Sequence, residues 1–267
     1  MPRDNVTLDL FAPAQRADEM EQIQELIRAG ALFVCSHSGG KDSQAMHIKL
    51  RQIVPAEQLV VIHAELPGVE WQGTEAHARA TTAGFRFELV RAGKTFFEMV
   101  EARGYWPSPQ YRQCTSDLKR GPIERRIRQL VKETGRNVVV SCMGLRAEES
   151  SNRAAQATFR RSERNSKAGR QWFEWLPIHA MTTPEVFASI AAAGETPHWA
   201  YAAGMSRLSC CFCIMSSLSD LRTAARLNPA LFRRYVETER RIDQTFVMPG
   251  KAGRRFLTEI VGELEAA

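Results

Sequence analysis

A glycine-rich hexapeptide constrains the fold of this chain more than any other feature of its sequence. Residues 38–43 read Ser-Gly-Gly-Lys-Asp-Ser. They follow the apolar run 31–35, which is typical of a strand buried on both faces of a parallel sheet, and they precede apolar residues at helical spacing over 45–50. A glycine-rich turn that joins a strand to a helix can bind phosphate through backbone N–H groups and the helix dipole. The hexapeptide therefore predicts a nucleotide-binding α/β protein.

The side chains of this loop suit an anion cradle. Gly39 and Gly40 let the backbone approach a phosphate where a side chain would block it. Lys41 can neutralise phosphate charge, Asp42 can help to position Mg²⁺, and the two serine hydroxyls can donate hydrogen bonds. The spacing differs from the Walker loop, which has four residues between its first Gly and Gly-Lys. The alternative is a turn with no ligand. We assign phosphate binding to Ser38, Gly39, Gly40, Lys41, Asp42 and Ser43.

Strand and helix patterns alternate along most of the chain, which predicts a doubly wound, mostly parallel sheet of Rossmann-like type. Further strands are expected at 59–62, 85–90 and 138–140, and helices at 16–30, 73–83, 94–102, 117–134, 184–193, 217–227 and 229–245. In such sheets ligands bind beyond the carboxyl ends of the strands. We divide the chain into a helical lead-in (1–30), a nucleotide-binding domain (31–216) and a helical C-terminal extension (217–267).

A basic segment at 150–171 interrupts these patterns. It has few large apolar residues, and we expect a mobile loop. Its cations are Arg153, Arg160, Arg161, Arg164, Lys167 and Arg170. Together with a net charge of +6, they favour a DNA or RNA partner that orders the loop on binding, with Trp172 or Phe173 either stacked on a base or in the core. The alternative is a solvated surface loop.

The cysteines divide into two kinds. Cys210 and Cys213 form a C-x-x-C that can bring two thiolates to one metal or cluster, with Cys211 between them. Cys35 and Cys142 lie in apolar runs, where a buried, inert thiol is expected. The polar N-terminus and the lack of a long apolar run predict a cytoplasmic protein without membrane contact.

Several segments beyond the loop resemble the superfamily of phosphoadenosine phosphosulfate (PAPS) reductases and PP-loop ATP pyrophosphatases, which has the adenine nucleotide alpha hydrolase-like fold. They are residues 62–70, 112–115, 144–150, 176–178 and 207–210. The Gly-Gly and Lys-Asp-Ser pattern looks more like the pyrophosphatase branch with its iron–sulfur sulfur-transfer proteins. The resemblance implies that Glu65 contacts ribose or adenine, that Gly144 and Arg146 belong to the nucleotide site, and that Lys41, Asp42 and Arg146 are the catalytic residues.

The resemblance also places Cys114 on the same face as Cys210 and Cys213 and implies a four-iron four-sulfur cluster on these three residues. Cys211 either completes four ligands or faces away and leaves one iron open. Zinc, a redox disulfide and unliganded thiols are the other interpretations.

The activity that the resemblance favours is cleavage of ATP at the α-phosphate with Mg²⁺, giving AMP and pyrophosphate, and sulfur transfer to an acceptor such as a nucleic acid. A cysteine desulfurase or thiol donor protein would supply the sulfur. Standard PAPS reductases have a C-terminal cysteine nucleophile, but no cysteine follows Cys213 here. One alternative is therefore a PAPS or APS reductase that uses an external thiol. A noncatalytic nucleotide-binding regulatory subunit is the other.

Overall fold

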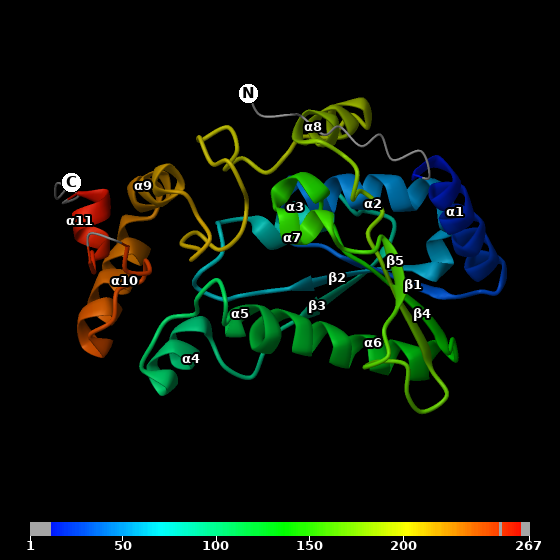
Figure 1. The fold of residues 1–267 in the computed structure, drawn as a ribbon, viewed down its shortest axis with the longest axis horizontal. Helices are drawn as coiled ribbons and strands as arrows, with labels where there is room; N and C mark the ends of the chain where they lie inside the picture. The colour runs from blue at the N-terminus through cyan, green and yellow to red at the C-terminus, as the bar shows by residue number, and fades with distance from the viewer. Residues whose placement is uncertain (1–11, 251–252, 263–267) are drawn as a thin grey trace, which may run out of the picture.

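The computed structural model describes residues 12–250 and 253–262, and a six-stranded sheet organises them (Figure 1). The strands are β1 (Leu32–Ser36), β2 (Leu59–Ala64), β3 (Arg86–Val90), β4 (Val138–Cys142), β5 (Phe159–Arg161) and β6 (Gln171–Trp175). Their order is β3-β2-β1-β4-β6-β5, and only β5 is antiparallel to its neighbour. The predicted mostly parallel, doubly wound fold is confirmed.

The sheet separates two cores because alternate residues of a strand point to opposite faces. From β1, Phe33 and Cys35 enter the core that includes residues of α1 (Ala12–Arg28) and α2 (Lys41–Ile53). Leu32 and Val34 enter the core formed with α6 (Gly121–Thr134). Both cores are apolar, which explains why β1 reads as a continuous apolar run.

Helices cover both faces, as Figure 1 shows. Besides α1 and α2, one side has α3 (Thr74–Ala80) and α8 (Thr183–Ala192), and α8 packs on α2. The other side has α6, which the five-residue π-helix Ser116–Arg120 and the short α5 (Gln113–Thr115) precede. A short helix α7 (Ser151–Ala154) follows the 3-10 turn Ala147–Glu149.

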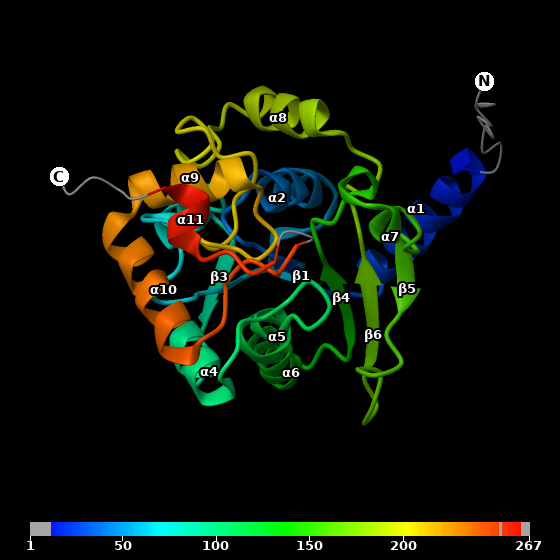
Figure 2. The same ribbon diagram turned by 60° about the vertical axis from the view of Figure 1, so that its left-hand side comes forward.

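The C-terminal helices share a third core with α4 (Phe96–Arg103). They are α9 (Leu218–Leu227), α10 (Pro229–Ile242) and α11 (Leu257–Val261), which gather at one end of the molecule (Figure 2). Tyr235 of α10 lies at the centre of this core and stacks on Trp106 with ring centroids 5.4 Å apart. The expected C-terminal helices are therefore present. Residues 1–11 of the lead-in and 263–267 of the extension lie outside the described residues.

The expectation of a loop over 150–171 is wrong. This segment contains α7 and the edge strand β5, and it runs directly into β6, which the sequence analysis did not predict. Phe159 of β5 stacks on Phe173 of β6 with centroids 5.3 Å apart, and Arg160 pairs with Glu174 across the two strands. Cross-strand pairs of this kind stabilise a strand that is rich in charge.

None of the helices in the described part of the chain is long and apolar enough to cross a membrane.

Candidate nucleotide site and cysteine cluster

The phosphate loop lies between β1 and α2, at the carboxyl edge of the sheet. Its own hydrogen bonds hold it closed: the Ser38 N–H donates to Ser43 Oγ at 3.1 Å, and that hydroxyl donates to the Gly40 carbonyl at 2.8 Å. Gly39 has a left-handed φ of 79°, and a Cβ there would lie 2.6 Å from Thr74 Cγ2. Glycine is therefore required at this position by both conformation and space.

The three predicted catalytic residues form one network. The Lys41 ammonium group lies 2.9 Å from Asp42 Oδ2, although Lys41 is only 4% exposed. The other carboxylate oxygen of Asp42 accepts a hydrogen bond from Arg146 Nε at 2.6 Å. The structure thus joins residues that are more than a hundred positions apart in the chain. Asp42 lies between two cations and fixes both of them.

Arg146 has a different environment from the one expected. The residue is 2% exposed, and its guanidinium also donates to Glu148, to the Met181 carbonyl (3.2 Å) and to Thr183 Oγ1 (3.1 Å). Each guanidinium nitrogen therefore already has an acceptor within the protein. This arrangement makes Arg146 a residue that positions Asp42, and Glu148 orients it.

Tyr201 covers the loop from a distant segment, a contact with no signal in the sequence. The Lys41 backbone N–H donates to the Tyr201 hydroxyl at 3.0 Å, and Lys41 Nζ lies 5.7 Å from the ring centroid. A Cβ on Gly40 would lie 3.3 Å from the same hydroxyl and 3.4 Å from Leu208 Cβ. Burial raises the pKa of Tyr201 to about 12, so the phenol is protonated at neutral pH. The chain around residues 201–208 forms one wall of the loop.

The two remaining nucleotide-site candidates lie on either side of the loop. A Cβ on Gly144 would approach the Asp42 carbonyl atoms to 3.0 Å, so Gly144 lets the chain after β4 pack on the start of α2. Glu65 directly follows β2, and its carboxylate pairs with Arg91. Both residues lie at the carboxyl edge, where the fold predicts a ligand.

The structure brings the three predicted cysteine ligands into one region. Among the described residues, however, no three His, Cys, Asp or Glu side chains are arranged to hold a metal ion. Cys114 lies on α5, whereas Cys210 and Cys213 precede α9, yet each thiol is close enough to influence the pKa of another. The Lys119 ammonium lies among them, and its pKa is raised above all by Cys210. Burial raises the pKa of Cys210 to about 12. Cys211 is fully buried in the C-terminal core, and its N–H donates to the Val69 carbonyl at 2.8 Å.

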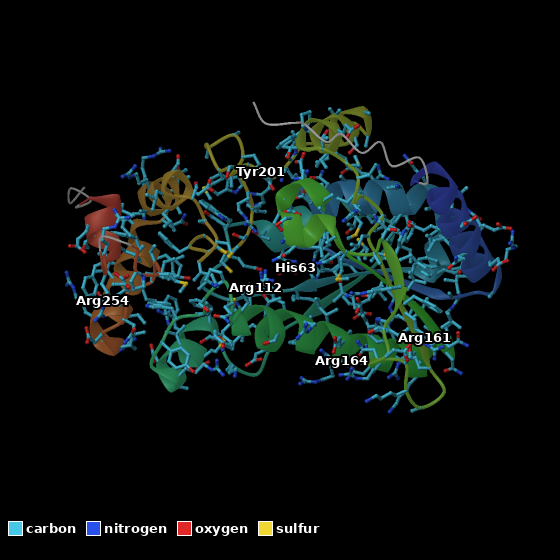
Figure 3. All side chains as sticks on the ribbon, in the orientation of Figure 1. His63, Arg112, Arg161, Arg164, Tyr201 and Arg254 are labelled. Carbon is cyan, nitrogen blue, oxygen red and sulfur yellow. The ribbon has the colours of Figure 1, made fainter. Side chains whose placement is uncertain are left out.

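A chain of histidines connects the loop with this cluster. His37 Nδ1 accepts the Gly39 N–H at 3.1 Å, and the His37 carbonyl is 2.8 Å from His63 Nδ1. His63 Nε2 is 3.4 Å from Glu70, whose backbone pairs with that of Cys210. Burial opposes protonation of His63, but the hydrogen bond and charge of Glu70 outweigh it and raise the pKa of His63. Figure 3 shows His63 in the middle of the molecule.

The sequence analysis assigned no role to His63, Lys119 or Tyr201. His63 did give a signal, because it is a histidine in the otherwise apolar β2. Cys35 and Cys142 are both fully buried and lie beside each other in the register of β1 and β4, which confirms the expectation of buried thiols.

The basic residues of 150–171 do not gather beside the phosphate loop. Because β6 is parallel to β4 and begins at Gln171, the turn 162–170 lies at the amino edge of the sheet, opposite the loop. Figure 3 shows Arg161 and Arg164 toward the end of the molecule away from Tyr201. Trp172 is 2% exposed and belongs to the core against α6, so it cannot stack on a base.

Comparison with known proteins gives a family match. A family model of the phosphoadenosine phosphosulfate reductase domain matches residues 32–216. An uncharacterized protein of Methanocaldococcus jannaschii is 26% identical over 200 residues, which cover 74% of this chain and 39% of that protein. An uncharacterized 37.8 kDa protein of Escherichia phage 186 is 29% identical over 152 residues, 57% of this chain and 44% of that protein. The chain thus spans less than half the length of either relative.

Two similar solved structures are enzymes. The PAPS reductase of Candida auris in a phosphate complex matches with a TM-score of 0.46 at 15% identity. The match covers 70% of this chain and 87% of the reductase chain. The U34-tRNA thiolase NcsA of Methanococcus maripaludis, solved with its 4Fe–4S cluster, has a TM-score of 0.41 at 15% identity and covers 92% and 88%.

Proposed function

Since the chain belongs to the phosphoadenosine phosphosulfate reductase domain family, we propose that it binds ATP at the loop 38–43, cleaves it to AMP and pyrophosphate, and supports sulfur transfer. The observation that carries this proposal is that a phosphate-binding loop and a group of thiols lie close together at one edge of the sheet. The loop with its Lys41–Asp42 pair lies there, and so does the group of three thiols, connected to it through His37, His63 and Glu70.

In the first step an acceptor oxygen attacks the α-phosphorus of ATP, and the bond to the β-phosphate breaks. Negative charge accumulates on the departing pyrophosphate. The buried Lys41 ammonium is held by Asp42 before the reaction, and such preorganised charge is usually the largest catalytic contribution. Arg146 acts indirectly by holding Asp42 in place. Mg²⁺ would enter with the nucleotide phosphates, as is usual for this ion.

The second step is displacement of AMP from the acceptor by a sulfur nucleophile. A cysteine desulfurase or thiol donor protein would supply that sulfur. The group of Cys114, Cys210 and Cys213 would hold an iron–sulfur cluster, and a cluster of this kind can bind or activate sulfur at an iron.

The residues fit such a group. Thiolates are the usual ligands of iron–sulfur clusters, and the positive charge of Lys119 offsets theirs. One zinc ion, with Zn–S bonds of about 2.3 Å, needs its thiols within about 4 Å of one another. Among the residues described, no three His, Cys, Asp or Glu side chains are arranged to hold a metal ion. We therefore base the cluster on the chemistry of the thiols, and not on a preformed metal geometry.

The test is to incubate the purified, anaerobically prepared protein with ATP, Mg²⁺ and a nucleic acid that offers the acceptor oxygen, and to measure pyrophosphate. We expect release that the Lys41→Met variant loses and the Lys94→Met variant keeps, because Lys94 is an exposed lysine outside the loop. Sulfite release from PAPS without pyrophosphate release from ATP would instead identify a sulfonucleotide reductase. Nucleotide binding without either product would identify a regulatory subunit.

A further inference from the structure

A strip of positive charge runs along α6 and onto the β5–β6 turn. Residues 120–136 contain six Lys and Arg against two Glu, and residues 159–171 contain five against one. Their combined excess of eight is larger than the net charge of +6 of the whole chain. The two segments touch, because Glu124 of α6 pairs with Arg164 and accepts a hydrogen bond from Asn165. Much of the positive charge of the molecule therefore lies in two neighbouring segments.

Four cations of these segments line a common groove of about 660 Å³, and we call Arg125, Arg128, Lys132 and Arg170 the cation strip. The first three are spaced by three and four residues, so they share one side of α6. No Asp or Glu lines the groove. Arg125 also lines a second hollow toward the carboxyl edge, where Lys94 pairs with Asp117.

The length of the strip suits a repeating anion, because its three α6 cations span about 10.5 Å along the helix axis. The helical rise of about 1.5 Å per residue separates neighbouring cations of α6 by roughly 4.5 and 6 Å along the axis. A nucleic-acid duplex presents a phosphate every ~3.4 Å along each strand, so a row at this separation can contact several phosphates of one backbone. We propose that the cation strip binds the phosphate backbone of a duplex or folded nucleic acid.

The surroundings of the strip favour this partner over others. Large exposed apolar side chains in the described residues lie elsewhere, at Tyr105, Tyr111, Trp199, Met215, Leu218 and Met248. The strip thus has no apolar residues to insert into a membrane surface and no aromatic platform for the bases of a single strand. The cation strip would contact only the charged phosphates, so binding would not depend on the base sequence of the nucleic acid. Arg160 and Arg164 have carboxylate partners and contribute less than the sequence suggests. Arg128 of the strip lies 3.9 Å from Glu124, whereas no ion pair is found for Arg125 or Lys132 among the described residues.

The strip also has a direction. The segment Ser116–Arg120 connects α5, which carries Cys114, directly to α6, so this helix begins near the thiols. The β5–β6 turn contacts α6 at Glu124, near its start, and continues beside it to the groove at its far end, about 21 Å along the helix. A backbone bound along α6 therefore reaches the cysteine cluster at one end. This makes a nucleic acid the acceptor of the sulfur, a conclusion that rests on the proposed function, whereas the binding itself does not.

The experiment measures fluorescence anisotropy of a labelled RNA or DNA duplex of about 20 base pairs, two helical turns, as full-length protein is added. Between 50 and 200 mM salt we expect steeply falling affinity. The triple variant R125Q/R128Q/K132Q should weaken binding at least tenfold and reduce the slope of log K against log salt by about 2 to 3, since each phosphate contact contributes about 0.9.

The matched control is R226Q/R233Q/R240Q, which removes the same charge from exposed positions of α9 and α10 and should bind nearly as the parent does. Equal weakening by both triple variants, or binding that ignores salt, overturns the proposal. So does equal, strip-dependent binding to phosphatidylserine vesicles. Should the first variant lose its fold, R125Q/K132Q tests the two exposed cations alone.

Pyrophosphate release separates the two proposals. Strip-dependent duplex binding by a protein that releases no pyrophosphate supports the surface and overturns the proposed reaction. Pyrophosphate release by a protein that does not bind a duplex overturns the surface.

Discussion

The Tyr201 hydroxyl accepts a hydrogen bond from the Lys41 backbone N–H, which belongs to the proposed phosphate-binding loop. A phosphate oxygen and the phenol compete for the Lys41 N–H, so Tyr201→Phe removes the competitor and keeps the ring contact with Phe187. One hydrogen bond has a net value of about 1 kcal/mol, which corresponds to roughly five- to tenfold in affinity. We expect ATP to bind more tightly by this factor in a calorimetric titration. Tyr111→Phe, at an exposed tyrosine, is the control. Weaker binding by Tyr201→Phe would mean that the phenol contacts the nucleotide.

Gly144 has no room for a side chain, because a Cβ would lie 3.0 Å from the carbonyl carbon and oxygen of Asp42 and 3.2 Å from the Ser43 nitrogen. Gly144→Ala should therefore move the start of α2 and cost about 1 to 3 kcal/mol of unfolding free energy, with loss of ATP affinity. Urea unfolding and calorimetry measure the two effects. Gly93→Ala is the control, since nothing lies within 4 Å of its Cβ position. Equal effects at both glycines would contradict the packing argument.

Among single residues, the sequence predicts those functional residues that lie within a short, continuous motif. The loop 38–43 is continuous in the chain, and the C-x-x-C of Cys210 and Cys213 is compact. Tyr201 is 160 residues from its partner Lys41, and no periodicity encodes that contact. The sequence also could not show that every guanidinium nitrogen of Arg146 has an acceptor, because Asp42 and the pair Met181 and Thr183 come from two segments distant in the chain.

Among the elements, α10 holds the C-terminal segment through a buried carboxylate. Glu239 is fully buried, and its two oxygens accept the N–H groups of Phe246 at 2.6 Å and of Leu257, the first residue of α11, at 2.9 Å. Glu239→Ala leaves both N–H groups without this acceptor, and each such loss costs about 1 to 3 kcal/mol. We expect urea unfolding to show a loss of about 2 to 5 kcal/mol and proteolysis to cut between α10 and α11. Glu237→Ala, at an exposed position of α10, should do neither.

The helices and strands that the sequence predicted are those whose buried residues follow a regular apolar pattern. β1, β2 and β4 are buried on both faces, and α6 alternates apolar and charged sides. β5 and β6 were missed because their pairing depends on contacts across the hairpin, notably Phe159 with Phe173. A count of charges along 150–171 could not predict that Glu174 and Glu124 would fix Arg160 and Arg164.

For the molecule as a whole, buried histidines with lowered pKa values reduce stability in acid, and His63, whose pKa is raised, opposes this effect. Burial, with a smaller effect of Arg51, lowers the pKa of His47 from 6.5 to about 4. Between about pH 6.5 and 4, His47 therefore binds a proton in the unfolded chain but not in the native state. The free energy of unfolding falls as the pH drops through this range. His47 alone should account for about 2 kcal/mol between about pH 7 and pH 5. Burial likewise lowers the pKa of His37 and of His198, which adds to this loss.

Urea unfolding of His47→Gln at the two pH values tests this expectation. The difference in unfolding free energy between pH 7 and pH 5 should be smaller in the variant than in the parent by about 2 kcal/mol, whatever the variant's stability at pH 7. His179→Gln, at a half-exposed histidine, is the control. An unchanged difference in His47→Gln would show that His47 takes up its proton without unfolding.

The two outermost strands have a consequence for association. An edge strand presents unpaired N–H and C=O groups to which a strand of another molecule can add. Here β3 has five residues and carries the Arg86–Glu88 ion pair, while β5 has three residues and carries Arg160 and Arg161. Short, charged edges discourage such addition, because an incoming strand would have to bury these charges. The sheet therefore ends within one molecule, and self-association through continuous β-structure, the first step toward fibrils, is disfavoured at both edges.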